Sequence, residues 1–336
     1  MKISKLLGCI AACALISGAA FAQQAPIVIK FSHVVAQDTP KGKGAEKFKQ
    51  LAEAKTKGKV KIEIYPNSQL YKDKEELEAL QLGAVQMLAP SLAKFGPLGV
   101  KEFEVFDLPY IFQSKEVLDK VTQGKIGADL MKKLDGKGIT GLAYWDNGFK
   151  IMSANKPLKK VDDFKGQKMR IQSSKVLDAQ MRALGAMPQV MAFSEVYQAL
   201  QTGVVDGTEN PPSNMFTQKM HEVQKHATVS NHGYLGYAVI VNKKFWDGLP
   251  ADVRTDLESA MNEASKYANE IAQKENDDSL AAIKASGKTE LYTLSAEEKD
   301  AWRKALLSTH RDMETRVGKE LIESIYKEAA ALGFKN

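Results

Sequence analysis

The segment GQKMRIQSSKVLDAQMRAL, residues 166–184, decides the fold class. Its residues 168–171 are strand-like, and residues 176–184 carry apolar side chains at helical spacing. Residues 194–201 predict another helix, and Val204-Val205 a further short strand. Strands that alternate with helices in this way indicate an α/β fold with a largely parallel sheet.

The same alternation continues on the N-terminal side of this segment. Buried strands are predicted at residues 27–31, 85–89 and 139–145. Residues 60–64 alternate between apolar and charged side chains, which predicts a half-exposed strand. A first α/β unit therefore precedes residue 150, and a second unit of the same kind begins near that point.

On the C-terminal side, residues 237–241 predict one more buried strand, and residues 251–285 contain almost no helix breakers. A helix of about 30 residues reaches about 45 Å, which is longer than one small domain, so we expect it to run across both units. A cleft between two such units is a common place for a small ligand. We predict one domain from residues 23–148 and 236–275, and a second domain from residues 149–235 and 276–330.

The N-terminus has the pattern of a signal peptide. Lys2 and Lys5 give the N-terminus a positive charge, and residues 6–20 form an apolar stretch. Ala20-Phe21-Ala22 fits the small-residue site at which a signal peptide is cut. A membrane span needs about 20 apolar residues, and the stretch is shorter than that. We therefore predict that residues 1–22 are removed by a cut after Ala22 and that the protein is periplasmic.

Both cysteines of the chain, Cys9 and Cys13, lie in this leader. A lipoprotein-type box around Cys9 is the alternative interpretation, but it precedes the apolar stretch that it should follow. After the cut after Ala22, the exported chain has no thiol, no disulfide and no cysteine metal ligand. Such a chain must be held together by packing alone.

Charge and motifs argue against several classes of function. The chain has 47 Lys and Arg and 41 Asp and Glu, which gives a net charge of +6. This charge is small and the charged residues are interspersed, which argues against nucleic-acid binding. No HExxH, P-loop, G-x-G-x-x-G or G-x-S-x-G motif is present. Pairs of acidic residues are numerous, and nothing singles one out. We expect no enzyme, no metal and no cofactor.

Three residues around two predicted strands could bind an anion. Thr39-Pro40 predicts a helix start whose free N–H groups attract an anion beside Lys41, although an ordinary capped helix with a solvated lysine is the alternative. Arg170 lies at the end of an otherwise apolar strand, and its planar guanidinium matches a carboxylate with two hydrogen bonds. It is either paired internally or open to a ligand. Ser173 faces a ligand or belongs to the cap of the next helix.

Other candidates have equally plain alternatives. Asn210 precedes a proline and is therefore extended, so its amide either points into a cleft or forms an Asx turn. Phe193 and Tyr237 fit a pocket wall or the core. Residues 144–150 end a strand where we place the crossing between the two units.

Together these segments resemble the solute-binding subunits of tripartite ATP-independent periplasmic (TRAP) transporters, over nearly the whole exported chain. The similarity is greatest to the DctP family, the branch that binds four-carbon dicarboxylates. The order and spacing of five stretches carry it: FSHVVAQDTPKG (31–42), VQMLAPSLAKF (85–95), YWDNGFK (144–150), GQKMRIQSS (166–174), and the run from FSEVYQAL to DGTENP (193–211).

The resemblance implies a two-domain α/β periplasmic binding protein with crossing hinge strands, a domain-spanning long helix and a ligand cleft between the domains. It implies that Arg170 takes a ligand carboxylate, that Asn210 contacts the same end, and that Phe193 walls the pocket. Lys150 stands where sugar-acid-binding members have arginine. Ser91 stands where those members have an acidic residue, which favours a short diacid over sialic acid.

Lys41 and His33 are our candidates for the second carboxylate, with Lys150 as an alternative to Lys41. Ser173 and Tyr237 complete the candidate set. We predict capture without chemistry: the cleft closes on a small organic acid, such as succinate, malate or fumarate, and a monomeric protein delivers it to TRAP membrane permease subunits. A sensor subunit that presents its ligand to a receptor is the alternative, since both use the closed form. A periplasmic lyase acting on a similar acid is a third hypothesis.

Overall fold

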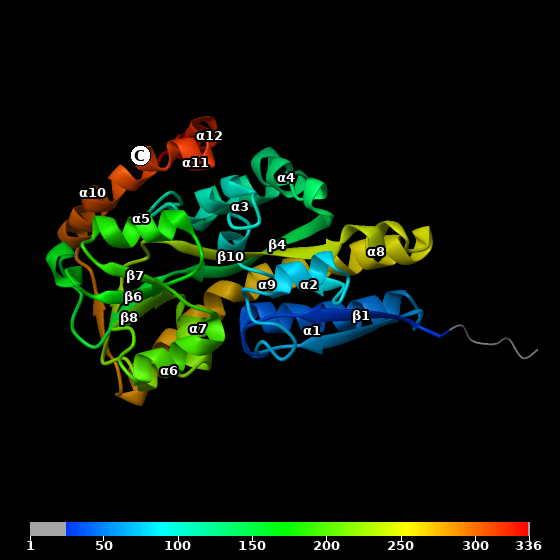
Figure 1. The fold of residues 1–336 in the computed structure, drawn as a ribbon, viewed down its shortest axis with the longest axis horizontal. Helices are drawn as coiled ribbons and strands as arrows, with labels where there is room; N and C mark the ends of the chain where they lie inside the picture. The colour runs from blue at the N-terminus through cyan, green and yellow to red at the C-terminus, as the bar shows by residue number, and fades with distance from the viewer. Residues whose placement is uncertain (1–24, 335–336) are drawn as a thin grey trace, which may run out of the picture.

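Two β-sheets organise the computed structural model, which describes residues 25–334 (Figure 1). The predicted signal peptide, residues 1–22, lies outside the described residues. The first sheet has the order β2-β1-β3-β10-β4 and the second the order β11-β9-β5-β8-β6-β7. Figure 1 places β6, β7 and β8 at one end of the molecule and β1 toward the other, with β4 and β10 running between them.

The first sheet contains β1 (Ile27–Ser32), β2 (Val60–Tyr65), β3 (Met87–Leu88), β4 (Ile139–Phe149) and β10 (Tyr234–Asn242). The second contains β5 (Ile151–Ala154), β6 (Lys168–Ile171), β7 (Met187–Val190), β8 (Gly207–Asn210), β9 (His226–Val229) and β11 (Glu290–Thr293). β1 is parallel to β2 and β3, and β6 is parallel to β7 and β8. β10 is antiparallel to β3 and β4, and β5 to β8 and β9.

The prediction of a largely parallel sheet is therefore wrong, because both sheets are mixed. The antiparallel pairs arise where the chain passes between the sheets. β4 ends at Phe149 and β5 begins at Ile151, so a nearly continuous strand leaves the first sheet and enters the second. The chain returns between β9 and β10, and β10 pairs with β4 from Tyr234↔Phe149 to Asn242↔Ile139.

The helices cover these sheets. They are α1 (Pro40–Lys55), α2 (Glu76–Gln81), α3 (Lys115–Gln123), α4 (Lys125–Lys132), α5 (Lys175–Ala183), α6 (Val196–Gln201), α7 (Pro212–Thr217), α8 (Lys243–Asp247), α9 (Ala251–Ser286), α10 (Ala296–Asp312), α11 (Glu314–Val317) and α12 (Lys319–Ala331). Short 3₁₀ helices are η1 (Leu92–Lys94), η2 (Lys101–Asp107), η3 (Asp135–Lys137), η4 (Val161–Phe164), η5 (Phe193–Glu195) and η6 (Met220–Glu222). No described helix is both long and apolar enough to cross a membrane.

The predicted long helix is α9. It has 36 residues, which is about 54 Å at about 1.5 Å per residue. It packs against α1 and β4 of the first unit and against α7 of the second unit. Small buried alanines on one face, Ala260, Ala264 and Ala268, let it lie close to the first unit. Gly287 ends the helix in the left-handed conformation that glycine adopts without strain.

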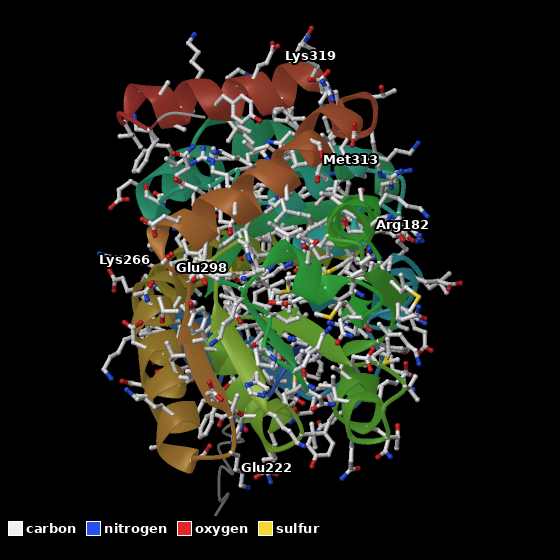
Figure 2. All side chains as sticks on the ribbon, turned by 90° about the vertical axis from the view of Figure 1, so that its left-hand side faces the viewer. Arg182, Glu222, Lys266, Glu298, Met313 and Lys319 are labelled. Carbon is white, nitrogen blue, oxygen red and sulfur yellow. The ribbon has the colours of Figure 1, made fainter. Side chains whose placement is uncertain are left out.

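The C-terminal helices connect the two units a further time. Trp302 of α10 is buried against Phe164 beside the second sheet, with ring centroids 5.0 Å apart. In Figure 2, Glu298 marks the first turn of α10, Met313 follows its last residue, and Lys319 begins α12. α11 and α12 then pack against η2 and α3 on the first unit, although we placed residues 276–330 in the second domain. The precise domain boundaries stay a prediction.

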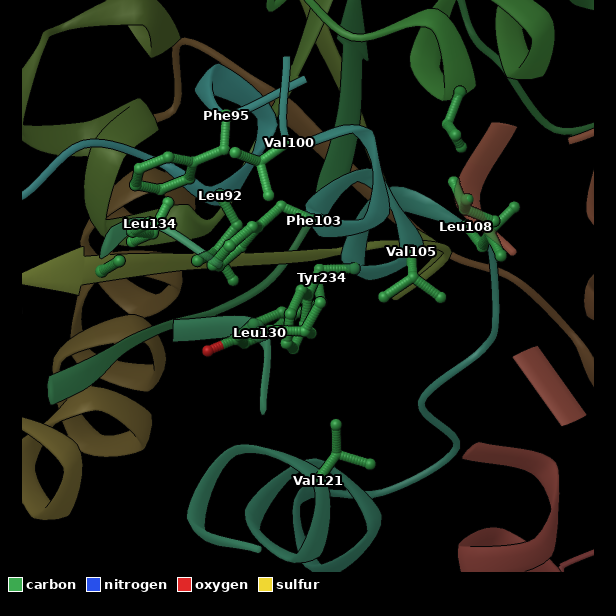
Figure 3. Packing of buried hydrophobic residues seen from close by; sticks show 14 of the residues in the cluster. Leu92, Phe95, Val100, Phe103, Val105, Leu108, Val121, Leu130, Leu134 and Tyr234 are labelled. Atoms are coloured by element: carbon green, nitrogen blue, oxygen red, sulfur yellow. The ribbon is translucent and has the colours of Figure 1, made fainter. Parts of the chain in front are cut away.

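A large apolar cluster supports this side of the first sheet. Figure 3 shows Phe95, Phe103 and Leu130 packed together with Tyr234 of β10. The ring centroids of Phe95 and Phe103 are 4.6 Å apart. Each such side chain contributes about 1.5–3 kcal/mol when it is fully buried, so the cluster gives the crossing strands a rigid support.

Candidate ligand-binding site

A small pocket lies between the two sheets, and both contribute its walls. It is lined by Val34, Val35, Asp73, Glu76, Ser91, Lys94, Arg170, Gln172, Phe193, Asn210, Asn214, Leu235 and Tyr237. The space inside is about 20 Å³, close to what one water molecule needs. The structure therefore brings five of the nine candidate residues to one place: Ser91, Arg170, Phe193, Asn210 and Tyr237.

Hydrogen bonds across the pocket hold the two sides together. The Ser91 hydroxyl donates to the side-chain oxygen of Gln172. The backbone N–H of Phe193 donates to Asp73 Oδ1 at 3.3 Å, from the second unit to the first. At the exposed rim, Lys72 Nζ lies 3.0 Å from Glu195 Oε1. The cleft is therefore closed.

Arg170 is the buried cation of the second sheet that the sequence singled out. It lies on β6, is 1 % exposed, and its Nε and Nη2 both donate to the carbonyl of Met191, at 3.1 and 2.9 Å. It forms no ion pair with a carboxylate among the described residues. Burial lowers the pKa of Arg170. A guanidinium that is desolvated and unpaired gains a great deal from a carboxylate partner.

Asn210 and Phe193 flank this cation. Asn210 ends β8 just before Pro211, and the contacts of its amide nitrogen with described side chains are long, 3.4 Å to Thr208 Oγ1 and 3.6 Å to Met220 Sδ. A better acceptor would replace both contacts at little cost. The Phe193 ring centroid lies 5.8 Å from the Arg170 guanidinium carbon and closes one side of the pocket.

Ser91 and Tyr237 meet on the first unit, where they form an isolated β-bridge. The Tyr237 hydroxyl accepts a hydrogen bond from the Asn214 amide at 3.4 Å, which joins β10 to α7 across the cleft. Burial raises the pKa of Tyr237, so it stays a neutral hydrogen-bonding group.

Lys41 and His33 are buried behind the pocket wall and do not line it. Lys41 Nζ donates to the Ala89 carbonyl at 2.9 Å and lies 3.7 Å from the centroid of the Tyr237 ring. Burial lowers the pKa of Lys41 to about 7 and that of His33 to about 3, so His33 is neutral. Thr39 accepts from the Gly42 N–H as an ordinary helix cap.

Three charged residues of the wall, Asp73, Glu76 and Lys94, were not among the predicted ones. Lys94 is the last residue of η1, and its Nζ lies 2.6 Å from Asp73 Oδ2. Both side chains are buried. Glu76 begins α2 and is 1 % exposed. Two of them carried a signal in the sequence: Lys94 lies just before the end of the apolar stretch 85–95, and Glu76 shares the helix face of Ala79 and Leu80.

Lys150 and Ser173 are not at the pocket. Lys150 lies between β4 and β5, where its Nζ is 2.7 Å from Glu209 Oε1. The other Glu209 oxygen accepts from Gln180 and faces His232 Nε2, each at 2.8 Å. Although burial opposes ionisation, Lys150 and His232 hold the pKa of Glu209 well below its usual range.

Ser173 is half-buried outside the pocket lining. Its neighbours take the two roles that the sequence left open for this segment. Ser174 caps α5 by accepting from the Leu177 N–H, and Gln172 lines the pocket. In the three residues after β6, one side chain therefore caps the next helix and another lines the pocket.

A larger hollow of about 1180 Å³ lies on the outside of the molecule, between α3, α4, β4 and α9. It is open to solvent, and its lysines and acids are mostly exposed, as with Lys132 and Glu270. We assign the ligand site to the smaller pocket, because buried charges of both units converge in it, whereas the charges that line the larger hollow are mostly exposed. The described residues contain no cluster of three or more His, Cys, Asp or Glu that could hold a metal.

Comparison with known proteins agrees with this geometry. The family DctP, described as bacterial extracellular solute-binding protein, family 7, matches residues 31–316. The C4-dicarboxylate-binding periplasmic protein DctP of Rhodobacter capsulatus is 74 % identical over 300 residues, which cover 89 % of this chain and 90 % of that protein. The C4-dicarboxylate-binding protein DctB of Bacillus subtilis is 44 % identical over 303 residues, 90 % of this chain and 86 % of that protein.

Solved structures are equally similar. A TRAP periplasmic solute-binding protein of Sulfurospirillum deleyianum with bound succinate is 48 % identical with a TM-score of 0.87, over 90 % of this chain and 98 % of that chain. A TRAP periplasmic solute-binding protein of Pseudomonas aeruginosa with bound L-malate is 46 % identical with a TM-score of 0.83, over 85 % of this chain and 100 % of that chain.

Proposed function

Since this chain belongs to the DctP family of bacterial extracellular solute-binding proteins, we propose that it is the periplasmic subunit of a TRAP transporter that captures a C4-dicarboxylate. Succinate, malate and fumarate are the proposed ligands. The observation that carries the proposal is Arg170, a buried guanidinium without a carboxylate partner among the described residues, in a pocket that both sheets wall.

The two ends of the pocket suit a short diacid. Arg170 binds one carboxylate, and Asn210 donates its amide to the same end. Lys94, which also lines the pocket, binds the other carboxylate, and Lys41 adds positive charge from behind the wall. Phe193 excludes water from the first carboxylate, which strengthens the charged hydrogen bonds. These ligand contacts are proposals.

The magnitudes fit this arrangement. A micromolar complex needs about −8 kcal/mol. Over the eight or so heavy atoms of succinate this is about −1 kcal/mol per atom, within the ceiling of about −1.5 for very small ligands. Such efficiency requires desolvated, charge-assisted contacts at both ends of the ligand.

Capture requires the cleft to open and close. The enclosed space of about 20 Å³ is too small for a four-carbon diacid to enter without movement of the walls. β4 with β5 and β9 with β10 form the two crossings about which the units can move. The ligand stabilises the closed form, which the permease subunits of the membrane then recognise. We also propose export with the cut after Ala22.

A thermal-shift screen of refolded protein from residue 23 onward tests the proposal, since refolding removes any ligand carried through purification. Succinate, malate or fumarate at about 100 times its dissociation constant should add about 2.7 kcal/mol of stability. Butyrate, a monocarboxylate of the same chain length, should add nothing. Absence of a shift with every diacid would overturn the proposed ligand class.

A further inference from the structure

Glu76 is a buried carboxylate that nothing in the fold neutralises directly. Its side chain lines the pocket, and neither carboxylate oxygen has a hydrogen-bond partner among the described residues. Burying an ionised carboxylate without donors is costly, and such a group either gains a partner or takes up a proton. Asp73, three residues earlier, is different, because Lys94 and the Phe193 N–H both bind it.

The charges that face Glu76 come from several elements. Lys41 on α1 and Lys94 on η1 are cationic, and Asp73 precedes α2. Arg170 on β6 is a third cation, which lines the same pocket. Tyr237 on β10 is a neutral neighbour of this group, and His33, also neutral, lies beside Lys41. Glu209, which also faces Arg170, is already bound by Lys150 and His232.

The balance of these charges does not match a dianion. The three cations exceed the two acids of the pocket by one charge when all five groups are ionised. A dicarboxylate brings two negative charges, which leaves one charge uncompensated in a closed and desolvated site. One proton on Glu76 removes this excess and also provides the hydrogen-bond donor that the carboxylate lacks.

We propose that one proton binds with each dicarboxylate dianion, and that Glu76 carries it as a carboxylic acid that donates a hydrogen bond to the ligand. The inference rests on the proposed ligand class. The proton comes from solvent, and no bond of the ligand is made or broken. Lys41 and Glu76 titrate as a pair: they share one proton before binding, and afterwards Lys41 is an ammonium and Glu76 an acid.

The pKa directions agree with this scheme. Burial raises the pKa of Glu76 to about 7, and burial lowers that of Lys41 to about 7. A bound dianion raises the pKa of both groups further. Because the more protonated pocket binds the dianion better, the affinity for the dianion should change little from about pH 6 up to about pH 7. It should fall by up to tenfold per pH unit above that value.

Calorimetry counts the proton. Succinate is titrated into refolded protein at about pH 8 in phosphate and in Tris, which differ in ionisation enthalpy. The difference in heat should correspond to the uptake of nearly one proton per succinate, and the uptake should be much smaller at about pH 6. Binding without proton uptake at pH 8 would overturn the inference and leave the proposed function standing. Failure of any diacid to bind would overturn the proposed function itself.

Infrared difference spectra locate the proton. Adding succinate should produce the carbonyl band of a protonated carboxylic acid, and Glu76→Gln should remove that band. Glu78→Gln, on the exposed face of the same helix, is the matched control and should keep it. Succinate labelled with carbon-13 must leave the band unmoved. A band that shifts with the label would place the proton on the ligand and overturn the assignment to Glu76.

Discussion

Two buried groups of charges lie at the junction of the two sheets, and they differ in how completely they are paired. In the crossing cluster, formed by Lys150, Gln180, Glu209, Ser230 and His232, each charge has partners. In the pocket, Arg170 and Glu76 have no ionic partner within salt-bridge distance among the described residues. Complete pairing indicates a structural role, whereas buried charge left unpaired in a cleft indicates a place for a ligand.

The comparison predicts that the crossing cluster determines stability. Lys150→Met leaves Glu209 buried with one strong partner fewer, so the free energy of unfolding should fall by about 3–5 kcal/mol. Urea denaturation at neutral pH measures this. Lys175→Met, at an exposed position at the start of α5, is the control and should change little. A Lys150 variant of normal stability that fails to bind succinate would mean that Lys150 serves the ligand after all.

The pocket should show the opposite behaviour. Arg170→Ala should weaken succinate binding by about 2–5 kcal/mol, because one carboxylate of the ligand is left buried and unpaired. Its melting temperature should fall less than that of the Lys150 variant, since the guanidinium forms no ion pair with any described residue and only its hydrogen bonds to the Met191 carbonyl are lost. Calorimetric titration and thermal melts measure the two effects. Arg182→Ala, on the exposed side of α5, should leave binding unchanged. Near-normal affinity of the Arg170 variant would refute its role.

The two buried glutamates should also differ in the sign of their pH dependence. The depressed pKa of Glu209 stabilises the fold above the unfolded value of about 4.3, and this contribution is lost as pH falls. The pKa of Glu76 is raised to about 7, so its contribution is present at low pH and is lost as pH rises from about 4.3 to 7.

Urea midpoints across this range test the contrast, with Glu209→Gln and Glu76→Gln as the two variants. The first variant should lose part of the decrease in stability on the acid side. The second should lose part of the decrease toward neutral pH. Two variants with the same pH slope as the wild type would contradict both assignments.

The smallest effect should come from the rim, where Lys72 and Glu195 join the two units in solvent. Both side chains are about half exposed, so Lys72→Ala should cost less than about 1 kcal/mol of ligand affinity. The loss should appear as faster succinate dissociation in stopped-flow measurements and should shrink at high salt. A large loss that salt does not reduce would mean that Lys72 contacts the ligand.

Much of this organisation could be predicted because it depends on local patterns. The α9 helix was predicted over residues 251–285 and is found over Ala251–Ser286, since an uninterrupted helical sequence needs no tertiary information. Arg170 was singled out because an arginine is unusual at the end of an apolar strand. Its position in a pocket wall agrees with that interpretation, and its contact with a ligand stays a prediction.

The remaining features depend on contacts between distant segments. Lys150 and Lys94 look alike in sequence, and only the fold shows that the first meets Glu209 while the second enters the pocket. Glu76 could be read as an ordinary surface residue of an acidic helix. The mixed sheets could not be predicted either, because strand direction depends on where the chain crosses between the units.

The strand order of the two sheets also bears on how the chain folds. Five strands of the second sheet, β5 to β9, come from residues 151–229 without interruption, so this unit can form as soon as that stretch is available. The first sheet cannot close until β10, residues 234–242, inserts between β3 and β4. Local pairings form faster than distant ones. The middle of the chain should therefore acquire structure first, while its N-terminal third waits for a strand made some 150 residues later.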